Sequence, residues 1–100
     1  MRHFRVIVQP SAQQDVARLN DYIERVCAAP LTARRYYEGL MARLRKLEHG
    51  AMLARVSSEL SEQMGLEIRR ANYKAMAILY SVDGDVVYIH RIIPQNMIIY

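Results

Sequence analysis

Cysteine, histidine and glycine are scarce in this chain, and each scarcity excludes a class of protein. The single cysteine, Cys27, excludes an intramolecular disulfide and fits a reducing compartment. One cysteine and three scattered histidines give no metal-ligand spacing, so we expect no structural zinc site and no cofactor. The four glycines are isolated, which excludes a Gly-rich loop that cradles phosphates.

Long apolar runs and targeting signals are also lacking. No stretch approaches the roughly 20 apolar residues that a membrane span needs. The opening residues Met1 to Arg5 lead straight into a strand-like run, unlike a signal peptide. No repeat, linker or low-complexity tract divides the chain. We therefore expect residues 1–100 to form a single cytoplasmic domain without a membrane partner.

The overall composition is that of a small globular domain. Hydrophobic residues make up 52% of the chain and charged residues 24%, which excludes intrinsic disorder. The formal net charge is +4. This mildly basic balance permits an acidic partner, whether nucleic acid or protein, without demanding one.

The first half of the chain predicts one strand and two helices. Residues 4–9 are rich in Val and Ile and predict a strand at the sheet edge or next to the C-terminal strands, which Pro10 ends. Ser11 and Gln14 have the spacing of a capping box, and Asp15 would favour the positive end of the helix that follows. The apolar spacing predicts that this helix stops near residues 27–29, before Pro30.

A second amphipathic helix is expected from about Thr32 to Glu48, ended by His49 and Gly50. The short connection makes the two helices an antiparallel hairpin. The outer side of the second helix carries the cations Arg34, Arg35, Arg43, Arg45 and Lys46. A solvated face and a surface for a polyanion both explain them. Residues 51–64 give no clear pattern, and a loop, a helical turn and an extended arm stay open.

The last third predicts a three-stranded antiparallel meander. A type I′ turn at Asp83-Gly84 joins two apolar runs, and a softer break falls at Asn72-Tyr73. The register this turn implies pairs Val82 with Asp85, Tyr80 with Val87, Ile78 with Ile89 and Met76 with Arg91.

Alternation along these strands gives two faces. The expected core face carries Met76, Ile78, Tyr80, Val82, Val87 and Ile89. The other face carries Ala75, Ala77, Leu79, Ser81, Val86, Tyr88 and His90. We interpret this second face as a shallow groove, with a second partly buried face as the alternative. The predicted fold is α+β, in the order β-α-α-β-β-β, with an antiparallel sheet and the helical hairpin on one face.

The remaining candidates for chemistry are polar residues of the meander and tail. Cleavage of RNA by its own 2′-hydroxyl needs a base, an acid and cations near the phosphorane. Arg69, Lys74 and Arg91 could be the cations, and His90 or Tyr100 could transfer protons. A buried structural histidine, a structural arginine ion pair and a frayed terminus are the simpler explanations. Whether the chain is an enzyme stays open.

An ordered set of residues across nearly the whole chain resembles the RelE/ParE superfamily of bacterial type II toxins, and more closely its ParE branch. In chain order these are Pro10-Ser11-Ala12, Asp15, Tyr22-Ile23, Pro30 with Ala33 and Tyr36, Leu44 with Leu47, Gly65-Leu66 with Arg69, Tyr73-Lys74, Ile78-Leu79-Tyr80, and Val87 through Arg91-Ile92. One departure is Pro94-Gln95-Asn96, where many relatives have a histidine.

The resemblance implies a toxin silenced by a cognate antitoxin. ParE-like members poison DNA gyrase, and RelE-like members cleave mRNA on the ribosome. The resemblance favours a toxin that inhibits gyrase and serves in plasmid or genome stabilisation. A ribosome-dependent nuclease is the alternative. Outside the toxin class, a small α+β binding module stays open. Tyr73, Tyr88 and Tyr100 are the candidate partner-binding residues, and a homodimer is left open.

Overall fold

The computed structural model describes residues 3–98 and shows a mixed five-stranded sheet within them. The sheet order is β1 (Arg5–Val8), β5 (Val86–Pro94), β4 (Met76–Asp83), β3 (Ile68–Tyr73) and β2 (Val56–Ser57). Neighbours pair antiparallel except β1, which runs parallel to β5. The predicted α+β class is confirmed, and the edge position of the first strand is too. The sheet is mixed rather than wholly antiparallel as predicted, because the edge strand β1 pairs parallel to β5.

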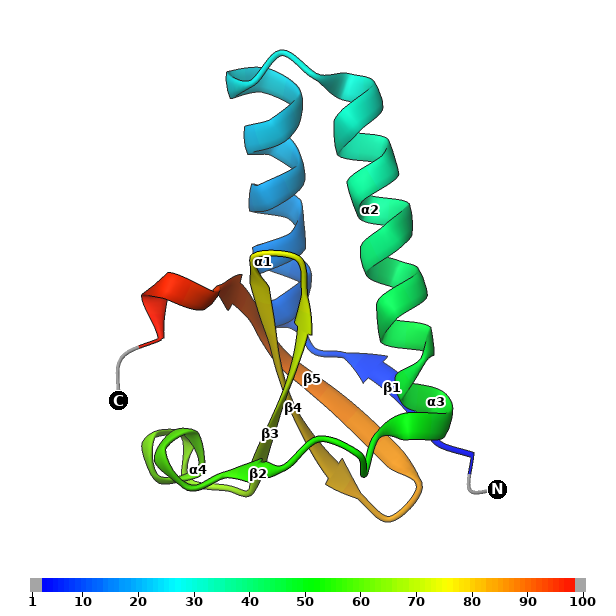
Figure 1. Ribbon diagram of the computed structural model, residues 1–100, viewed down its shortest axis with the longest axis vertical. Helices are drawn as coiled ribbons and strands as arrows, with labels where there is room; N and C mark the ends of the chain where they lie inside the picture. Colours follow the sequence, from blue (N-terminus) through cyan, green and yellow to red (C-terminus); the bar gives the residue numbers. More distant parts are fainter. Residues whose placement is uncertain (1–2, 99–100) are drawn as a thin grey trace.

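The helical hairpin consists of α1 (Pro10–Asp21), the π-helical turn η1 (Tyr22–Val26) and α2 (Pro30–Arg45). The two helices run antiparallel, and their connected ends project beyond the sheet (Figure 1). Pro10 and Pro30 each open a helix, where the missing N–H costs no intrahelical hydrogen bond. The predicted capping box is wrong: Gln9 is the N-cap residue, no side chain caps α1, and Ser11 already lies inside the helix.

The second helix begins at Pro30, two residues before the predicted start, and ends at Arg45, before the predicted end at Glu48. The short helix α3 (Leu47–Gly50) follows it, and Gly50 lies inside α3, so the predicted stop at His49 and Gly50 does not end α2. Residues 51–64, for which the sequence gave no clear prediction, form a turn, the short strand β2 and α4 (Ser58–Met64). The Ser57 Oγ accepts a hydrogen bond from the Leu60 N–H at 3.3 Å, which caps α4. Gly65 ends this helix with φ at +76°, a conformation that favours glycine.

The turn between β4 and β5 lies one residue later than predicted. Asp83 pairs with Val86, so Gly84 and Asp85 are the loop residues, and only Gly84 has positive φ. This is the dihedral pattern of a type II′ turn rather than type I′. Each β4 residue near the turn therefore faces a partner two positions further along β5 than predicted. A shift of two residues leaves every side chain on its predicted face, because side chains alternate with a period of two.

A β-bulge then changes the second half of the β4–β5 ladder. Tyr80 pairs with Ile89, but Leu79 pairs with Arg91, so His90 is the extra residue. Beyond the bulge the predicted pair Met76–Arg91 is wrong, and Met76 pairs with Pro94. Ile92 now faces the helices, where it is 1% exposed.

The break between β3 and β4 also falls later than Asn72-Tyr73, since both of those residues belong to β3. Tyr73 pairs with Met76, and the loop residues are Lys74 and Ala75. Lys74 has φ at +52°, which is uncommon for a residue with a side chain.

Both sheet faces are packed. The predicted core face is confirmed: Ile78, Tyr80, Val87 and Ile89 are fully buried among residues of α1, α2 and α3. The expected shallow groove on the other face is wrong. There, Ala77 and Leu79 are buried against Leu60 of α4 and Ile68. The sequence of residues 51–64 gave no clear prediction of a helix, so the packing of α4 on this face could not be predicted.

Candidate functional site

Arg69 lies in β3 on the helix-covered face of the sheet, because it pairs directly with the buried Tyr80. Its guanidinium donates to the carbonyl oxygen of Ala54, and more weakly to that of Met52 at 3.5 Å. Beside it, the Tyr80 hydroxyl donates to the Ala51 carbonyl at 2.7 Å. Burial raises the pKa of Tyr80, and the cations Arg69 and Arg43 partly offset that rise. Arg69 therefore holds the turn after α3 against the sheet.

Lys74 lies at the other end of β3, five residues and about 16 Å from Arg69 along the strand. Its ammonium sits 5.6 Å from the ring centroids of both Tyr36 and Tyr73. These two rings meet edge to face with centroids 5.1 Å apart. Burial, and then the neighbouring Tyr73, raise the pKa of Tyr36. Lys74 thus closes a cation–π contact that fastens the β3–β4 turn to α2.

His90, the bulge residue, lies on the face opposite Arg69. Its Nε2 is 2.7 Å from the Oγ of Ser81, and Ser81 alternates with the helix-facing Tyr80. Burial lowers the pKa of His90 below its ordinary 6.5, because a partly desolvated imidazole resists gaining a charge.

This lowered pKa predicts a pH-dependent stability. The unfolded chain takes up a proton at His90 before the folded chain does, so the free energy of unfolding should fall as the pH drops below 6.5. Above 6.5 the contribution of His90 is fully present. Urea unfolding at pH 5 and pH 7, with His90→Gln as the comparison, measures this. An equal pH slope in the variant and the parent would contradict the assignment to His90.

Arg91 is joined to α1 by an ion pair with Asp15. The Nε donates to one carboxylate oxygen at 2.7 Å, and the Nη2 donates to the other at 3.1 Å. The backbone N–H of Ile92 also donates to Asp15 at 2.9 Å. The hydrogen bond with Asp15 is the main cause of the raised pKa of Arg91. Sequence reasoning treated Asp15 as a helix-end charge and missed this role, although Asp15 was part of the family resemblance.

The four predicted catalytic residues do not converge on one point. Arg69 and His90 lie on opposite faces of the sheet, Lys74 lies at a distant turn, and Arg91 is committed to Asp15. Within residues 3–98, no base, acid and cation set gathers around a shared space from these four. A nuclease role for them stays a prediction, but each already has a structural contact.

The predicted partner-binding tyrosines are also separate. Tyr73 is half-buried against α2, and Tyr88 is half-buried in β5 beside Ile7 and Ser81. Tyr100 lies outside the described residues. A role in partner binding stays a prediction for all three.

An apolar hollow on the helical hairpin, which we call the hairpin groove, has a volume of about 450 Å³. It lies between α1 and α2 next to the end of β1. Its lining is Val8, Gln13, Val16, Ala17, Asn20, Tyr37 and Met41. Tyr37 is 46% exposed, so an apolar surface is open to solvent along this groove.

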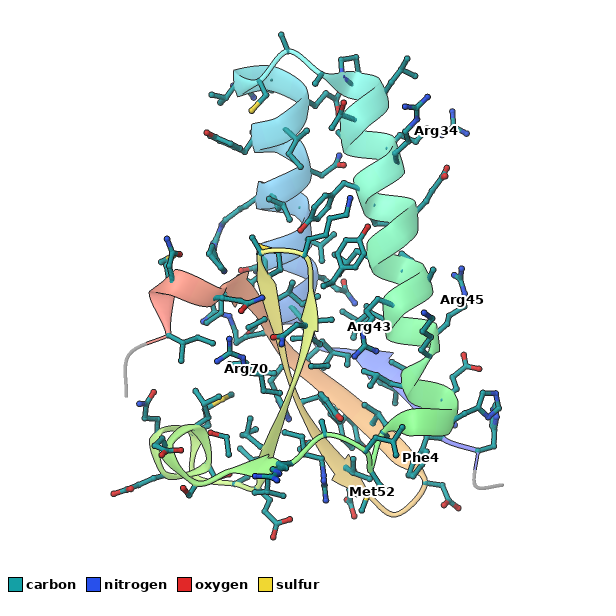
Figure 2. The ribbon with its side chains drawn as sticks, viewed as in Figure 1. Phe4, Arg34, Arg43, Arg45, Met52 and Arg70 are labelled. Atoms are coloured by element: carbon teal, nitrogen blue, oxygen red, sulfur yellow. The ribbon has the colours of Figure 1, made fainter. Side chains whose placement is uncertain are left out.

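A second hollow, the sheet-edge cleft, has a volume of about 510 Å³ and opens where β2 stops covering β3. Its rim is basic, with Arg43, Lys46 and Arg70 among the lining residues. The Nε of Arg43 donates to the Asn72 carbonyl at 3.0 Å. The predicted place of Arg43 on the outer side of α2 is therefore wrong. Figure 2 shows Arg43 directed toward the sheet, whereas Arg34 and Arg45 point away from it.

Comparison with known proteins decides the family. The sequence matches the family described as the ParE toxin of the type II toxin-antitoxin system parDE over residues 6–99. The chain belongs to the ParE toxin family. The predicted membership of the RelE/ParE superfamily, and of its ParE branch, is confirmed.

A solved structure agrees on the fold. A chain of the chromosomal ParDE toxin–antitoxin system from P. aeruginosa superposes with a TM-score of 0.77 at 18% sequence identity. The match covers 92% of this chain and 96% of that chain. Among curated proteins, none matches the sequence significantly.

As a member of the ParE family, the protein is the toxin component of a type II toxin–antitoxin pair, and an antitoxin is its partner. Within residues 3–98, no helix combines the length and apolar character needed to cross a membrane.

Proposed function

We propose that this ParE-family chain is a non-catalytic toxin that inhibits DNA gyrase. The observation that carries the proposal is the separation of Arg69, Lys74, His90 and Arg91, each of which is engaged in a contact that holds the fold together. Catalysis of RNA cleavage needs these groups within hydrogen-bond reach of one phosphate. A toxin that acts by binding needs only an exposed surface, which the projecting hairpin provides (Figure 1).

We further propose that the antitoxin covers the hairpin groove with the apolar face of a helical segment. The groove is open, mostly apolar and lined from two antiparallel helices, which suits recognition of an apolar helix face. The net charge of +4 favours an antitoxin segment that is acidic outside its apolar contacts. The expected compartment is the cytoplasm, where the exposed Cys27 thiol stays reduced. The homodimer stays a prediction.

The decisive experiment produces the chain in bacteria from a tight promoter, with and without its antitoxin. We expect growth arrest with intact mRNA and an induced DNA-damage response, relieved by the antitoxin. The purified chain should also inhibit supercoiling by gyrase in vitro. Arrest accompanied by mRNA cut at ribosomal positions, with full gyrase activity, would replace the gyrase proposal by the nuclease alternative.

The hairpin groove can be tested separately with Ala17→Glu. Ala17 is exposed, so the charge should leave the fold intact while it places a carboxylate against an apolar partner. We expect the affinity for the antitoxin to fall at least tenfold, measured by calorimetry, with growth arrest that the antitoxin no longer relieves.

The matched control is Gln14→Glu, which adds the same charge to an exposed position of α1 outside the groove lining. It should bind the antitoxin as the parent does. Equal affinities for Ala17→Glu and Gln14→Glu would place the antitoxin elsewhere, without touching the proposal about gyrase.

A further inference from the structure

Two histidines and a glutamate that lie far apart in the sequence meet at one corner of the fold. His3 precedes β1, and Glu48 and His49 belong to α3. Their nitrogen and carboxylate oxygen atoms all lie within 4.8 Å of one another. The imidazole rings of His3 and His49 have centroids 5.1 Å apart at an interplanar angle of 62°. None of these residues takes part in the surfaces described above.

The backbone around this cluster is fixed by buried neighbours. The N–H of Phe4 donates to the carbonyl of Glu48 at 2.7 Å, which ties the segment before β1 to α3. Phe4 is 1% exposed and Leu47 is 2% exposed, so the residue after His3 and the residue before Glu48 are both anchored in the core. Figure 2 shows Phe4 beside α3. The three side chains therefore lie at one corner of the surface, with both histidines exposed and Glu48 half-buried, without any rearrangement of the backbone.

We propose that His3, Glu48 and His49 form a binding site for Zn²⁺. Two imidazole nitrogens and one carboxylate are donors that Zn²⁺ accepts, and water would complete the coordination. Zn–N and Zn–O distances are about 2.0–2.2 Å, so donors around a tetrahedral ion lie about 3.4 Å apart. Rotation of the exposed side chains of His3 and His49 covers the difference from 4.8 Å. Sequence spacing could not show this site, because His3 and His49 are brought together only by packing.

The bound ion would fasten His3, which precedes β1, to α3. Because only the folded chain brings the three donors together, Zn²⁺ should raise the midpoint of thermal unfolding. At a free Zn²⁺ concentration of about one hundred times Kd, the expected rise is about 10–20 °C. This effect does not depend on gyrase, the antitoxin or toxicity.

The test measures Zn²⁺ binding by calorimetry and thermal unfolding on the full chain after removal of metals. Every protein carries Cys27→Ser, because an exposed thiol is itself a zinc ligand. The parent should bind one Zn²⁺ per chain. His3→Asn, Glu48→Gln and His49→Asn should each weaken binding at least tenfold and abolish the thermal shift. Glu62→Gln, which removes an exposed charge from α4, should bind as the parent does.

Two results would overturn the proposal. One is the absence of saturable binding in the parent. The other is a loss of affinity in the His3 variant alone, which would identify a chelate formed by His3 and the backbone before it. Zn²⁺ is the probe because Cu²⁺ and Ni²⁺ favour such square-planar nitrogen chelates. Circular dichroism at 25 °C verifies that each variant is folded, so that lost binding reports lost ligands.

Discussion

Replacement of Asp15 by alanine is expected to destabilise the fold by about 2–3 kcal/mol, which lowers the midpoint of thermal unfolding by about 10–20 °C. The Asp15 side chain is 7% exposed and accepts two hydrogen bonds from Arg91 and one from the Ile92 N–H. Alanine leaves that N–H without its acceptor and the guanidinium without its counterion. The estimate takes the lower end of the range for buried pairs, because the Arg91 side chain is 44% exposed.

Two further variants separate the parts of this contact. Asp15→Asn keeps an acceptor for the Ile92 N–H but removes the charge, so we expect a smaller loss of about 1 kcal/mol. Asp21→Ala removes a carboxylate from the same helix whose pairing with Arg25 is exposed, and it should cost less than 0.5 kcal/mol. Urea unfolding measures all three variants. Equal stabilities of Asp15→Ala and Asp21→Ala would refute the structural role of the Asp15–Arg91 pair.

The position of Asp15 also explains how the sheet ends. β1 pairs with β5 only as far as Val8–Ile89, so β1 does not cover the edge of β5 from His90 onward. Asp15 supplies the acceptor that a longer β1 would have offered to Ile92. The chain leaves the sheet at Gln9 and enters α1, and the carboxylate on the second turn of this helix replaces a strand residue.

Gly39→Ala is expected to destabilise the protein by about 1–3 kcal/mol, although alanine is the better helix former by about 1 kcal/mol. Gly39 lies in the interior of α2, where Tyr73 packs against it. A Cβ at this position would lie 2.0 Å from the Tyr73 hydroxyl oxygen and 2.9 Å from its Cζ. The Tyr73 ring cannot simply swing away, because it also contacts Tyr36 and the ammonium of Lys74.

A double-mutant cycle tests this explanation. Tyr73→Phe removes the hydroxyl that would clash, so it should restore about 1 kcal/mol or more in the Gly39→Ala background. Thr32→Ala, an exposed position of the same helix, controls for intrinsic helix propensity. Greater stability of Gly39→Ala than of the parent would show that the approach of Tyr73 to α2 is not tight. Because the same contacts hold Lys74, the variant should also loosen the β3–β4 turn.

The predictions that the structure confirms are those that rest on local sequence patterns. The apolar stripes of α1 and α2 and the alternation in β4 and β5 placed the helices and the core face correctly. The turn between β4 and β5 lies one residue later than predicted. The side chains near the turn still lie on their predicted faces, because each β4 residue there pairs with a β5 residue two positions further along than predicted. The bulge at His90 could not be predicted, because the alternation of apolar and polar residues along β5 does not show an extra residue.

The candidate site was less accessible to sequence reasoning. The residue types needed for RNA cleavage occur close together in the sequence, at Arg69, Lys74, His90 and Arg91. Strand alternation and a turn place these residues in different parts of the fold. The hairpin groove depends on the distance between α1 and α2, and no residue spacing in the sequence gives that distance. The predicted groove on the sheet is filled by α4, whose short sequence carried too little periodicity to identify it.

The sequence by itself determined the family, the helical hairpin and the side of the meander that faces it. Hydrophobic period is a property of neighbouring residues, so it survives without knowledge of the rest of the fold. Only the tertiary structure decided that Asp15 binds Arg91, that α4 closes the second face, and that His3 meets His49. Each of these contacts joins residues distant along the chain, and their meeting depends on how whole elements pack rather than on any local pattern.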